Sequence, residues 1–381
     1  MQKIKFEKLF NFEKKSKIKA GDGFKLGEGQ YPFYTSSNVL TKSIDEYLFE
    51  NESLIFGTGG LASIHFCNEK FAVSTDCFVT QPKDKNQVFS KFVYYYLSGN
   101  IHILENGFKG AGLKHISKDY LQNIEIPLPP LPTQQKIATI LDKADELRQY
   151  NKKLIEKYEA LTQSLFLDMF GDPVRNEKGF PLKKLEELYI SKKEGTKCGP
   201  FGGALKKDEF VEKGIPVWNM DNINKKGELV SEINLWITKE KYDILNSYSV
   251  INDDIIISRA GTVGKMCVVK TTFEKSIIST NLIRLRLDKN LLLPLFFVSL
   301  MTYFKERISR LQTGAEGAFT HMNTGVLNDI IFPYPPIALQ NQFAERVAII
   351  EAQKQQAQLA LAKSEALFQG LLQQAFNGEL N

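Results

Sequence analysis

This chain contains the same unit twice. The segment Ile126–Ala138, "IPLPPLPTQQKIA", returns at Phe332–Ala344 as "FPYPPIALQNQFA", at an offset of 206 residues that keeps prolines, glutamine and apolar residues in step. The match then continues without a gap, because "EALTQSLFLDMF" from Glu159 falls on "EALFQGLLQQAF" from Glu365. An ungapped match at this separation indicates a tandem repeat of one structural unit.

Shorter matches precede the proline segments, at offsets that drift as loop insertions would make them drift. They occur in the same order in both copies: "YPFYTSSNV" (Tyr31–Val39) and "IPVWNMDNI" (Ile215–Ile223), "SLIFGTGG" (Ser53–Gly60) and "DIIISRAG" (Asp254–Gly261), "VSTD" (Val73–Asp76) and "ISTN" (Ile278–Asn281). Each copy is therefore a globular module followed by a long segment of mixed polar and apolar residues.

The modules themselves carry signals for both strands and helices. Short runs such as "LIFG", "FAVS", "MCVV" and "LIRLRL" are rich in β-branched and aromatic residues and are bounded by Gly, Asn, Asp or Ser, which is typical of strands. One apolar stretch in each module, Lys91–Leu97 and Leu295–Ile308, has the pattern of a helix packed on the sheet. Each module is predicted to be α+β.

The segment after the first proline run has a heptad pattern. Apolar residues recur alternately three and four positions apart, with one polar member, at Ile137, Ile140, Ala144, Leu147, Asn151, Leu154, Tyr158, Leu161 and Leu165. The second copy, rich in Ala and Gln, is helix-prone but less regular, since Arg346 and Gln353 match Ile140 and Leu147. Neither stripe can be buried alone, so we expect the two helices to pair as an antiparallel coiled coil, with Asn151 fixing the register.

These elements give a complete architecture. The predicted fold class is α+β, with two pseudo-symmetric globular domains separated by an antiparallel coiled coil of two long helices. The expected boundaries are residues 1–130 and 172–336 for the domains, 131–171 for the first helix and 337–381 for the second.

Equivalent major-groove faces of DNA lie about 34 to 36 Å apart, so a protein with two related reading surfaces fits a bipartite site. Because the two modules differ in sequence, the two half-sites should differ as well.

Charge, apolar runs and cysteines restrict the compartment. A formal net charge of +5 permits an anionic partner without requiring one. The start, "MQKIKFEKLF", lacks the apolar core of an export signal, and the longest apolar run, Leu291–Met301, is interrupted by proline and too short to span a membrane. The cysteines form no CxxC pair, which argues against a structural zinc site and suits a reducing compartment. We expect a cytoplasmic protein without membrane contact.

Over nearly its whole length the chain resembles the specificity (S) subunit of type I restriction-modification systems. The residues that carry the resemblance are the paired proline segments together with "GPFGGALKKDEF" at Gly199–Phe210, "GIPVWNMDNI" at Gly214–Ile223 and "DDIIISRAGTVGK" at Asp253–Lys265. In that family two target recognition domains alternate with two central helices. The first module departs from the pattern, since "KAGDGFKLGEGQ" stands where "GPFG" is expected.

The resemblance implies a function without catalysis or a cofactor in this chain. Such a subunit binds double-stranded DNA and holds two methyltransferase (M) subunits, which use S-adenosylmethionine to methylate one adenine in each half-site. Motor-nuclease (R) subunits, which use ATP, are added to cut unmodified DNA. The sites to look for in this chain are therefore DNA contacts.

Candidate DNA contacts come from matched loops of the two modules. The segment "RAGTVGK" at 259–265 fails the phosphate-loop pattern at two positions. It is expected to be either a plain turn or a loop that brings Arg259, Thr262 and Lys265 to DNA, and Thr58 is the counterpart in the first module. The matched histidines lack neighbouring ligands at metal spacing, so their loops are expected either to face DNA or to order the turn through hydrogen bonds: Lys109, Lys114, His115, Thr320, His321 and Asn323.

Polar residues after a matched strand are the candidates for base reading. Amides can bind adenine bidentately and carboxylates can accept from cytosine, but the same residue types also cap turns: Ser36, Ser37, Asn38, Asn219, Asp221 and Asn222. Lys206 and Lys207 suit phosphate contacts or a solvated face.

Two other functions remain open from the sequence. A self-contained nuclease or methyltransferase would need a catalytic loop, and "FPYPP" at Phe332–Pro336 lacks the Asn or Asp of an amino-methyltransferase loop. A bivalent DNA-binding regulator without enzyme partners would show the same repeat. Association with a type I methyltransferase subunit separates these alternatives.

Overall fold

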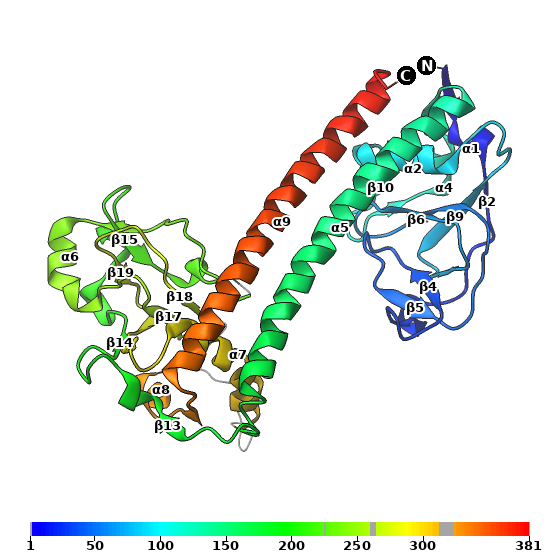
Figure 1. Cartoon of the computed structure of the whole chain (residues 1–381). Helices are drawn as coiled ribbons and strands as arrows, with labels where there is room; N and C mark the ends of the chain where they lie inside the picture. The colour runs from blue at the N-terminus through cyan, green and yellow to red at the C-terminus, as the bar shows by residue number, and fades with distance from the viewer. Residues whose placement is uncertain (1, 225, 260–263, 312–322, 381) are drawn as a thin grey trace. The chain divides into compact units, whose positions relative to one another are not determined.

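The computed structural model describes residues 2–224, 226–259, 264–311 and 323–380, with the backbone alone for 305–311. The chain divides into two compact units. Unit 1 comprises Met1–Ile155 and Gln356–Asn381, and unit 2 comprises Glu156–Gln355. Both long helices, α5 (Leu131–Phe170) and α9 (Ile337–Asn377), contribute one part to each unit (Figure 1). Each unit is thus one module together with part of both helices.

The first module builds two four-stranded sheets, in the orders β2-β9-β6-β7 and β3-β5-β4-β8, and a two-stranded pair β1-β12. Its elements are β1 (Gln2–Lys5), α1 (Phe6–Leu9), β2 (Phe10–Phe12), the 3-10 turn η1 (Ala20–Asp22), β3 (Phe24–Lys25), β4 (Tyr31–Tyr34), β5 (Lys42–Ile44), β6 (Ser53–Gly57), β7 (Ile64–Cys67), β8 (Ala72–Val73), β9 (Cys77–Pro82), α2 (Ser90–Gly99), α3 (His102–Glu105), β10 (Phe108–Lys109), β11 (His115–Ile116), α4 (Lys118–Gln122) and β12 (Glu125–Leu128).

The second module repeats this plan with the orders β14-β20-β17-β18 and β16-β15-β19 and the pair β13-β21. Its elements are β13 (Leu182–Lys184), η2 (Leu185–Leu188), β14 (Thr196–Cys198), η3 (Gly202–Ala204), η4 (Lys207–Glu209), β15 (Ile215–Trp218), η5 (Met220–Asn222), β16 (Trp236–Ile237), α6 (Lys239–Leu245), η6 (Asn246–Tyr248), β17 (Ile255–Ser258), β18 (Met266–Val268), β19 (Ile277–Ile278), β20 (Leu282–Leu285), α7 (Pro294–Leu311), α8 (Thr324–Asn328) and β21 (Ile331–Pro333).

Strand register confirms the internal repeat. The parallel pair β4-β8 places Tyr34 opposite Val73, and β15-β19 places Trp218 opposite Ile278, which are the residues that the sequence matches pair across the copies. Two further strand pairs extend the matches, since the matched Gly57 and Ser258 lie opposite Cys77 and Leu282, and the matched Pro127 and Pro333 lie opposite Lys3 and Leu182. The predicted α+β fold of two related modules with two long helices is therefore present.

Each module buries its apolar side chains against the long helices. In unit 1, Phe92 and Tyr95 of α2 pack beside Phe368 and Phe376 of α9, with Ile137 of α5 in the same core. In unit 2, Phe166 and Phe170 of α5 contact Phe296 of α7 and Phe343 of α9. Since the helices complete both cores, neither module is an independent globule beside them.

The two long helices run antiparallel within each unit. In unit 1, Arg148 lies over the Phe368 ring and Asn151 donates to Ser364, so numbers rise along α5 as they fall along α9. In unit 2, Glu159 lies 3.5 Å from Lys354, and Phe170 farther along α5 packs on Phe343, earlier in α9. The predicted antiparallel pairing is confirmed.

Burial along α5 corrects two of the nine predicted heptad positions. Leu147 and Leu161 are 46% and 48% exposed, so they do not lie in the seam. At the first two positions where two heptad phases differ, the phase is clear, because Leu141 is buried while Ile140 is half-buried, and Arg148 lies over the Phe368 ring of α9 while Leu147 is exposed. Farther along α5, positions of both the predicted and the alternative phase are half-buried: Leu154, Ile155, Tyr158, Thr162 and Leu165. From Ile137 a heptad can step first by three or by four residues, and the apolar character of Ile140 and Leu147 favoured the wrong step.

With the corrected phase, the second helix is regular. Its buried residues alternate three and four apart through Phe343, Val347, Ile350, Lys354, Ala357, Ser364 and Phe368, with Leu361 half-buried between them. Arg346 and Gln353, which made the second stripe look irregular, face solvent. The residues that interrupt its apolar character are Lys354 and Ser364, and Lys354 matches Arg148 of the first copy.

No helix among the described residues is both long enough and apolar enough to cross a membrane.

Candidate nucleic-acid interface

In module 1, loops that follow β4, β6 and β8 meet around Ser36. The Ser36 hydroxyl donates to the Asp76 carbonyl at 2.7 Å and accepts from the Gly59 amide at 3.3 Å. The amide of Thr58 donates to the same Asp76 carbonyl at 2.9 Å. Three loops that are separate in the sequence are therefore held in one polar cluster, which includes the predicted contacts Ser36 and Thr58.

His115 joins this cluster from the β10-β11 hairpin. Its Nδ1 lies 3.1 Å from the Thr58 carbonyl, and the backbone of Gly59 pairs with that of His115. A Cβ atom at residue 59 would come within 3.0 Å of the imidazole, so this approach favours glycine. Lys109 pairs with His115 across the hairpin, and both Lys109 and Lys114 are exposed.

The same cluster leaves some groups free to reach a ligand and uses others internally. Asn38 and His115 are exposed, whereas Thr58 is buried beneath them. Ser37 is half-buried: its hydroxyl accepts from the Val39 amide at 3.2 Å, and its carbonyl contacts His65. The exposed set combines an amide, an imidazole and two ammonium groups, which is chemistry suited to base edges and phosphates.

Module 2 brings the matched loops together through matched hydrogen bonds. The Ser279 amide donates to Trp218 as Ser74 does to Tyr34, and the Arg259 amide donates to Asn281 at 3.0 Å as Thr58 does to Asp76. The Arg259 guanidinium lies over the Phe201 ring at 4.6 Å. This contact joins the "GPFGG" segment to the loop of Arg259.

The glycine that opens the "GPFGG" segment has a steric reason. A Cβ atom at Gly199 would lie 1.9 Å from the Ser279 carbonyl oxygen, and the Gly199 amide donates to Leu282. The segment can therefore reach the Arg259 loop only because its backbone passes directly over Ser279.

Two amides of module 2 act inside their turn. Asn222 is 3% exposed, and its Nδ2 donates to the carbonyls of Val230 and Glu232 while its Oδ1 accepts from the Asn219 amide. Asn219 in turn accepts from the Asp221 amide at 2.7 Å, whereas Asp221 is exposed. For Asn222 this geometry favours the turn-capping alternative over a base contact.

Asn323 also caps. Its side chain accepts from the Val326 amide at the start of α8, as Ser117 accepts from Tyr120 at the start of α4. This favours the turn-ordering alternative for Asn323. Lys206 and Lys207 are exposed, and Lys265 is half-buried with its backbone paired to Ser258. Thr262, Thr320 and His321 lie outside the described residues.

Four residues near these loops escaped the sequence prediction. His65 contacts the Ser37 carbonyl at 2.8 Å, and burial lowers the pKa of its imidazole. Leu61 and Leu113 are 78% and 76% exposed on the loops that meet at the Gly59–His115 pair. Together with the exposed Phe201, these leucines add apolar surface beside the polar clusters. The sequence signal that could have identified Leu61, Leu113 and Phe201 is an apolar side chain next to glycine in a loop.

Comparisons with known proteins agree on one family. The family model described as the type I restriction modification DNA specificity domain matches residues 1–160 and 200–360. The MjaVIII specificity subunit of a type I restriction enzyme from Methanocaldococcus jannaschii is 26% identical over 372 residues, covering 89% of this chain and 85% of that one. The EcoBI specificity subunit from Escherichia coli is 24% identical over 370 residues, covering 91% and 77%.

Solved structures have the same fold. The crystal structure of a type I restriction-modification S subunit from M. genitalium superposes with a TM-score of 0.66 at 17% identity, covering 98% of this chain and 95% of that chain. A chain from a study of complex assembly and conformational transition of the type I R-M system superposes with a TM-score of 0.53 at 16% identity, covering 99% and 98%.

Proposed function

Because this chain belongs to the family of type I restriction-modification specificity subunits, we propose that each of its modules reads one half of a bipartite DNA site. The observation that carries this proposal is the pair of matched loop clusters, Ser36 with Thr58 and His115 in one module and Arg259 with Phe201 in the other. The two modules share the backbone bonds from Thr58 to Asp76 and from Arg259 to Asn281, but the side chains of the two clusters differ. The two half-sites should therefore differ in sequence.

In this proposal, the exposed lysines of each module and its other exposed polar side chains have different roles. Lys109 and Lys114 in module 1 and Lys206 and Lys207 in module 2 suit phosphate contacts, which position the protein without reading sequence. Asn38 and His115 in one module and Arg259 in the other carry the donors and acceptors for base edges.

The long helices set the spacing between the half-sites in this proposal. Helix α5 is a single helix of 40 residues, or about 60 Å at 1.5 Å per residue, and it takes part in the cores of both units. A continuous helix transmits a fixed separation in a way that a flexible linker does not. The unread gap between the half-sites should therefore have one length.

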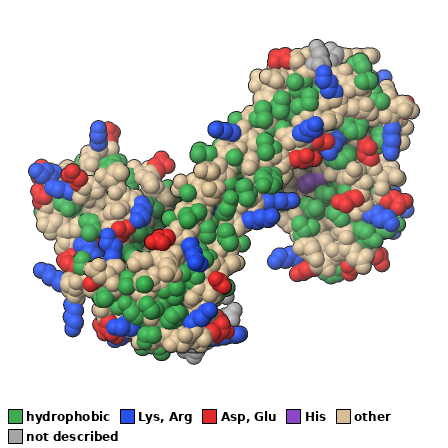
Figure 2. Space-filling model, viewed as in Figure 1, with side chains coloured by type: hydrophobic (Ala, Val, Ile, Leu, Met, Phe, Trp, Pro, Cys, Tyr) green, Lys and Arg blue, Asp and Glu red, His purple; other side chains and the backbone are tan. Residues whose placement is uncertain are grey.

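The helices also offer the docking surface for partner subunits. Large apolar side chains are exposed along them, at Leu147, Tyr150, Leu161, Ile349, Leu359 and Leu367, and Figure 2 shows apolar side chains along the visible face of the helices. Exposed apolar surface of this kind marks protein contacts. We assign it to two methyltransferase subunits, which use S-adenosylmethionine to methylate adenine, while motor-nuclease subunits that use ATP join the assembly. This chain supplies no cofactor or catalytic group, and the complex acts on DNA in the cytoplasm.

Co-expression with a type I methyltransferase subunit tests the proposal. The expected product is a complex that methylates adenines in a split, asymmetric sequence with one gap length, read from the methylated positions of the host genome. Inserting one heptad into both helices should lengthen the gap and leave both half-sites unchanged. A chain that binds DNA but associates with no such subunit would instead be a regulator, and the proposal would be wrong.

A further inference from the structure

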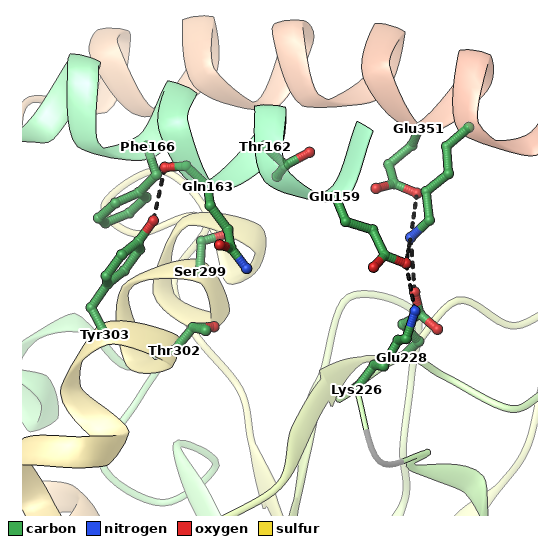
Figure 3. Close-up of a pocket in the computed structure, with 11 residues that line it drawn as sticks. Glu159, Thr162, Gln163, Phe166, Lys226, Glu228, Ser299, Thr302, Tyr303 and Glu351 are labelled. Carbon is green, nitrogen blue, oxygen red and sulfur yellow. Dashed lines mark hydrogen bonds and ion pairs between the residues drawn. The ribbon is translucent and has the colours of Figure 1, made fainter. Parts of the chain in front are cut away.

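A lysine lies buried in the seam of helix α9. The side chain of Lys354 is 7% exposed, and its Nζ lies 2.9 Å from Glu228, 3.5 Å from Glu159 and 4.0 Å from Glu351 (Figure 3). Burial lowers the pKa of a lysine, but the hydrogen bond to Glu228 and the neighbouring carboxylates raise the pKa of Lys354 overall. The ammonium group is therefore charged and held by carboxylates from separate segments.

Those carboxylates join module 2 to both long helices. Glu159 belongs to α5, Lys354 to α9, and Glu228 to a hairpin of module 2 in which Ile223 pairs with Leu229. Lys226 of the same hairpin reaches back to Glu159 at 2.7 Å. Helix α9 thus supplies a cation to a module anion, while helix α5 supplies an anion to a module cation.

The hairpin that carries these charges is held by its own hydrogen bonds and adjoins the candidate DNA turn. The Asn224 side chain donates to Glu228 at 2.8 Å and accepts from the amides of Lys226 and Glu228. The hairpin follows directly after the η5 turn, and Asn222 of that turn donates to the carbonyls of Val230 and Glu232 on its far side. A shift of the hairpin would therefore move the turn that contains Asp221.

Beside the ion pairs, the module is not sealed against the helices by packed side chains. A cavity of about 360 Å³ lies there, lined by five charged residues, the four above and Lys226, and, on its other side, by Thr162, Phe166 and Tyr303 (Figure 3). The Tyr303 hydroxyl donates to the Gln163 carbonyl across one edge of it. At this place, ion pairs provide the contact that close packing provides elsewhere.

Over its described residues, unit 1 does not repeat this arrangement. The residue that matches Lys354 is Arg148, which contacts Asp145 of its own helix and the Phe368 ring of α9. Module 1 is joined to α5 elsewhere, through Lys91 and Tyr95, which contact Asp142 at 2.7 and 2.6 Å. The contacts around Lys354 are thus a separate feature of unit 2.

We propose that Lys354, Glu228, Lys226 and Glu159 form an ionic clamp that fixes the orientation of module 2 on the long helices and so restricts the gap lengths that the protein accepts. The inference rests on the proposed function, because a gap exists only if the site is bipartite. The four residues are positioning residues: they select the spacing, and none of them reads a base. Of the four side chains only Lys354 is buried, at 7% exposed, so salt should screen its ion pairs less than the Lys226–Glu159 pair, whose side chains are 61% and 29% exposed.

Two variants test the clamp in the assembled complex. Lys354→Met removes the buried cation, and Glu228→Ala removes the module carboxylate while Lys354 keeps Glu159 and Glu351 nearby. We expect unchanged half-sites but methylation at gaps one base pair longer and shorter, with the preference for the original gap lowered about tenfold, or about 1.4 kcal/mol. Lys152→Ala is the control, because Lys152 forms an exposed pair with Glu365 on the same helices and should not change the gap.

A distance measurement on the isolated chain tests the clamp independently of methylation. Spin labels would be attached to cysteines that replace Ile244 of α6 and Ile349 of α9, which are both exposed and both in unit 2. Cys198, which is half-buried, would be replaced by serine so that it does not take up label. We expect a narrow distance distribution for the parent chain and a broader one for both variants. Distributions that match the parent would overturn the clamp, as would an unchanged gap preference. If instead the parent complex methylates no split site, the proposed function fails, and the distances alone decide the clamp.

Discussion

Gln134 and Gln340, 206 residues apart, are fully buried and make the same three hydrogen bonds in their respective units. The Gln134 side-chain oxygen accepts from the Phe89 amide just before α2, and its Nε2 donates to the carbonyls of Pro129 and Gln87. In the same way, the Gln340 oxygen accepts from the Leu293 amide just before α7, and its Nε2 donates to the carbonyls of Pro335 and Leu291. The repeated glutamine therefore attaches the first turn of each long helix to its module.

Replacing Gln134 by alanine should destabilise unit 1 by about 2 to 4 kcal/mol, because it leaves buried backbone groups without partners. Gln340→Ala should do the same in unit 2. Urea unfolding followed by circular dichroism measures both. The adjacent Gln135 is exposed, and Gln135→Ala should stay within about 0.5 kcal/mol of the parent chain. Equal stability of Gln134→Ala and Gln135→Ala would contradict the role of the buried amide.

The repeat made much of this fold predictable, since matched segments must form matched elements. Pro127 and Pro333 occupy the same register position of their strand pairs, as their alignment requires. The seam was wrong at Leu147 and Leu161 because a run of Ile and Leu fits two heptad phases, and only packing against α9 decides between Ile140 and Leu141.

The candidate interface was less predictable than the fold. His115 meets Thr58 across 57 residues of sequence, and no local pattern encodes such an approach. Asn38 and Asn222 match in sequence, but one is exposed and the other is buried, because Asn222 has carbonyls of Val230 and Glu232 to satisfy. The environment of an amide, which decides whether it caps a turn or reaches DNA, is set by tertiary contacts.

Asn151 should lower the stability of unit 1 while it fixes the register of α5 against α9. It is buried in the seam of unit 1, where its side chain donates to the Ser364 hydroxyl at the long distance of 3.4 Å, and that hydroxyl itself donates to the Leu361 carbonyl. Asn151→Leu should raise the free energy of unfolding by about 1 kcal/mol through added apolar burial. Lys153→Leu, at an exposed position of the same turn, should not. Loss of stability in Asn151→Leu would show that the polar pair is favourable by itself.

His65 should make unit 1 sensitive to mild acid. Burial lowers the pKa of its imidazole below the ordinary value of about 6.5, so below that pH the unfolded chain binds a proton that the folded chain does not. Stability should therefore be constant with respect to this group above pH 6.5 and fall as the pH drops below it. Urea midpoints at pH 7.5 and 5.5 should differ less in His65→Gln than in the parent chain. His102→Gln, at an exposed position, should keep the parent's difference.

Leu147 should matter for assembly and not for folding. It is 46% exposed on α5, so Leu147→Ser should change the free energy of unfolding by no more than about 0.5 kcal/mol. If this face docks a methyltransferase subunit, the same change should weaken that association by about tenfold or more, as truncation of an interface anchor does. Calorimetric titration of the two purified subunits measures it. Glu146→Ser, at the neighbouring exposed position, is the matched control, and equal affinity of the two variants would place the docking surface elsewhere.

Arg259 should determine one half-site only. Its guanidinium is held over Phe201 and its amide is fixed to Asn281, so its donors are oriented before DNA arrives. Arg259→Ala should cost about 1 to 3 kcal/mol in binding and relax the base preference at one position of the module 2 half-site. Phe201→Ala should produce a weaker relaxation at the same position, because the arginine remains but loses its support. Lys239→Ala, an exposed cation on α6, should leave both half-sites unchanged. Methylated positions in genomes carrying each variant give the answer, and a change in the module 1 half-site would mean that Arg259 acts on the whole assembly instead of on its own reading surface.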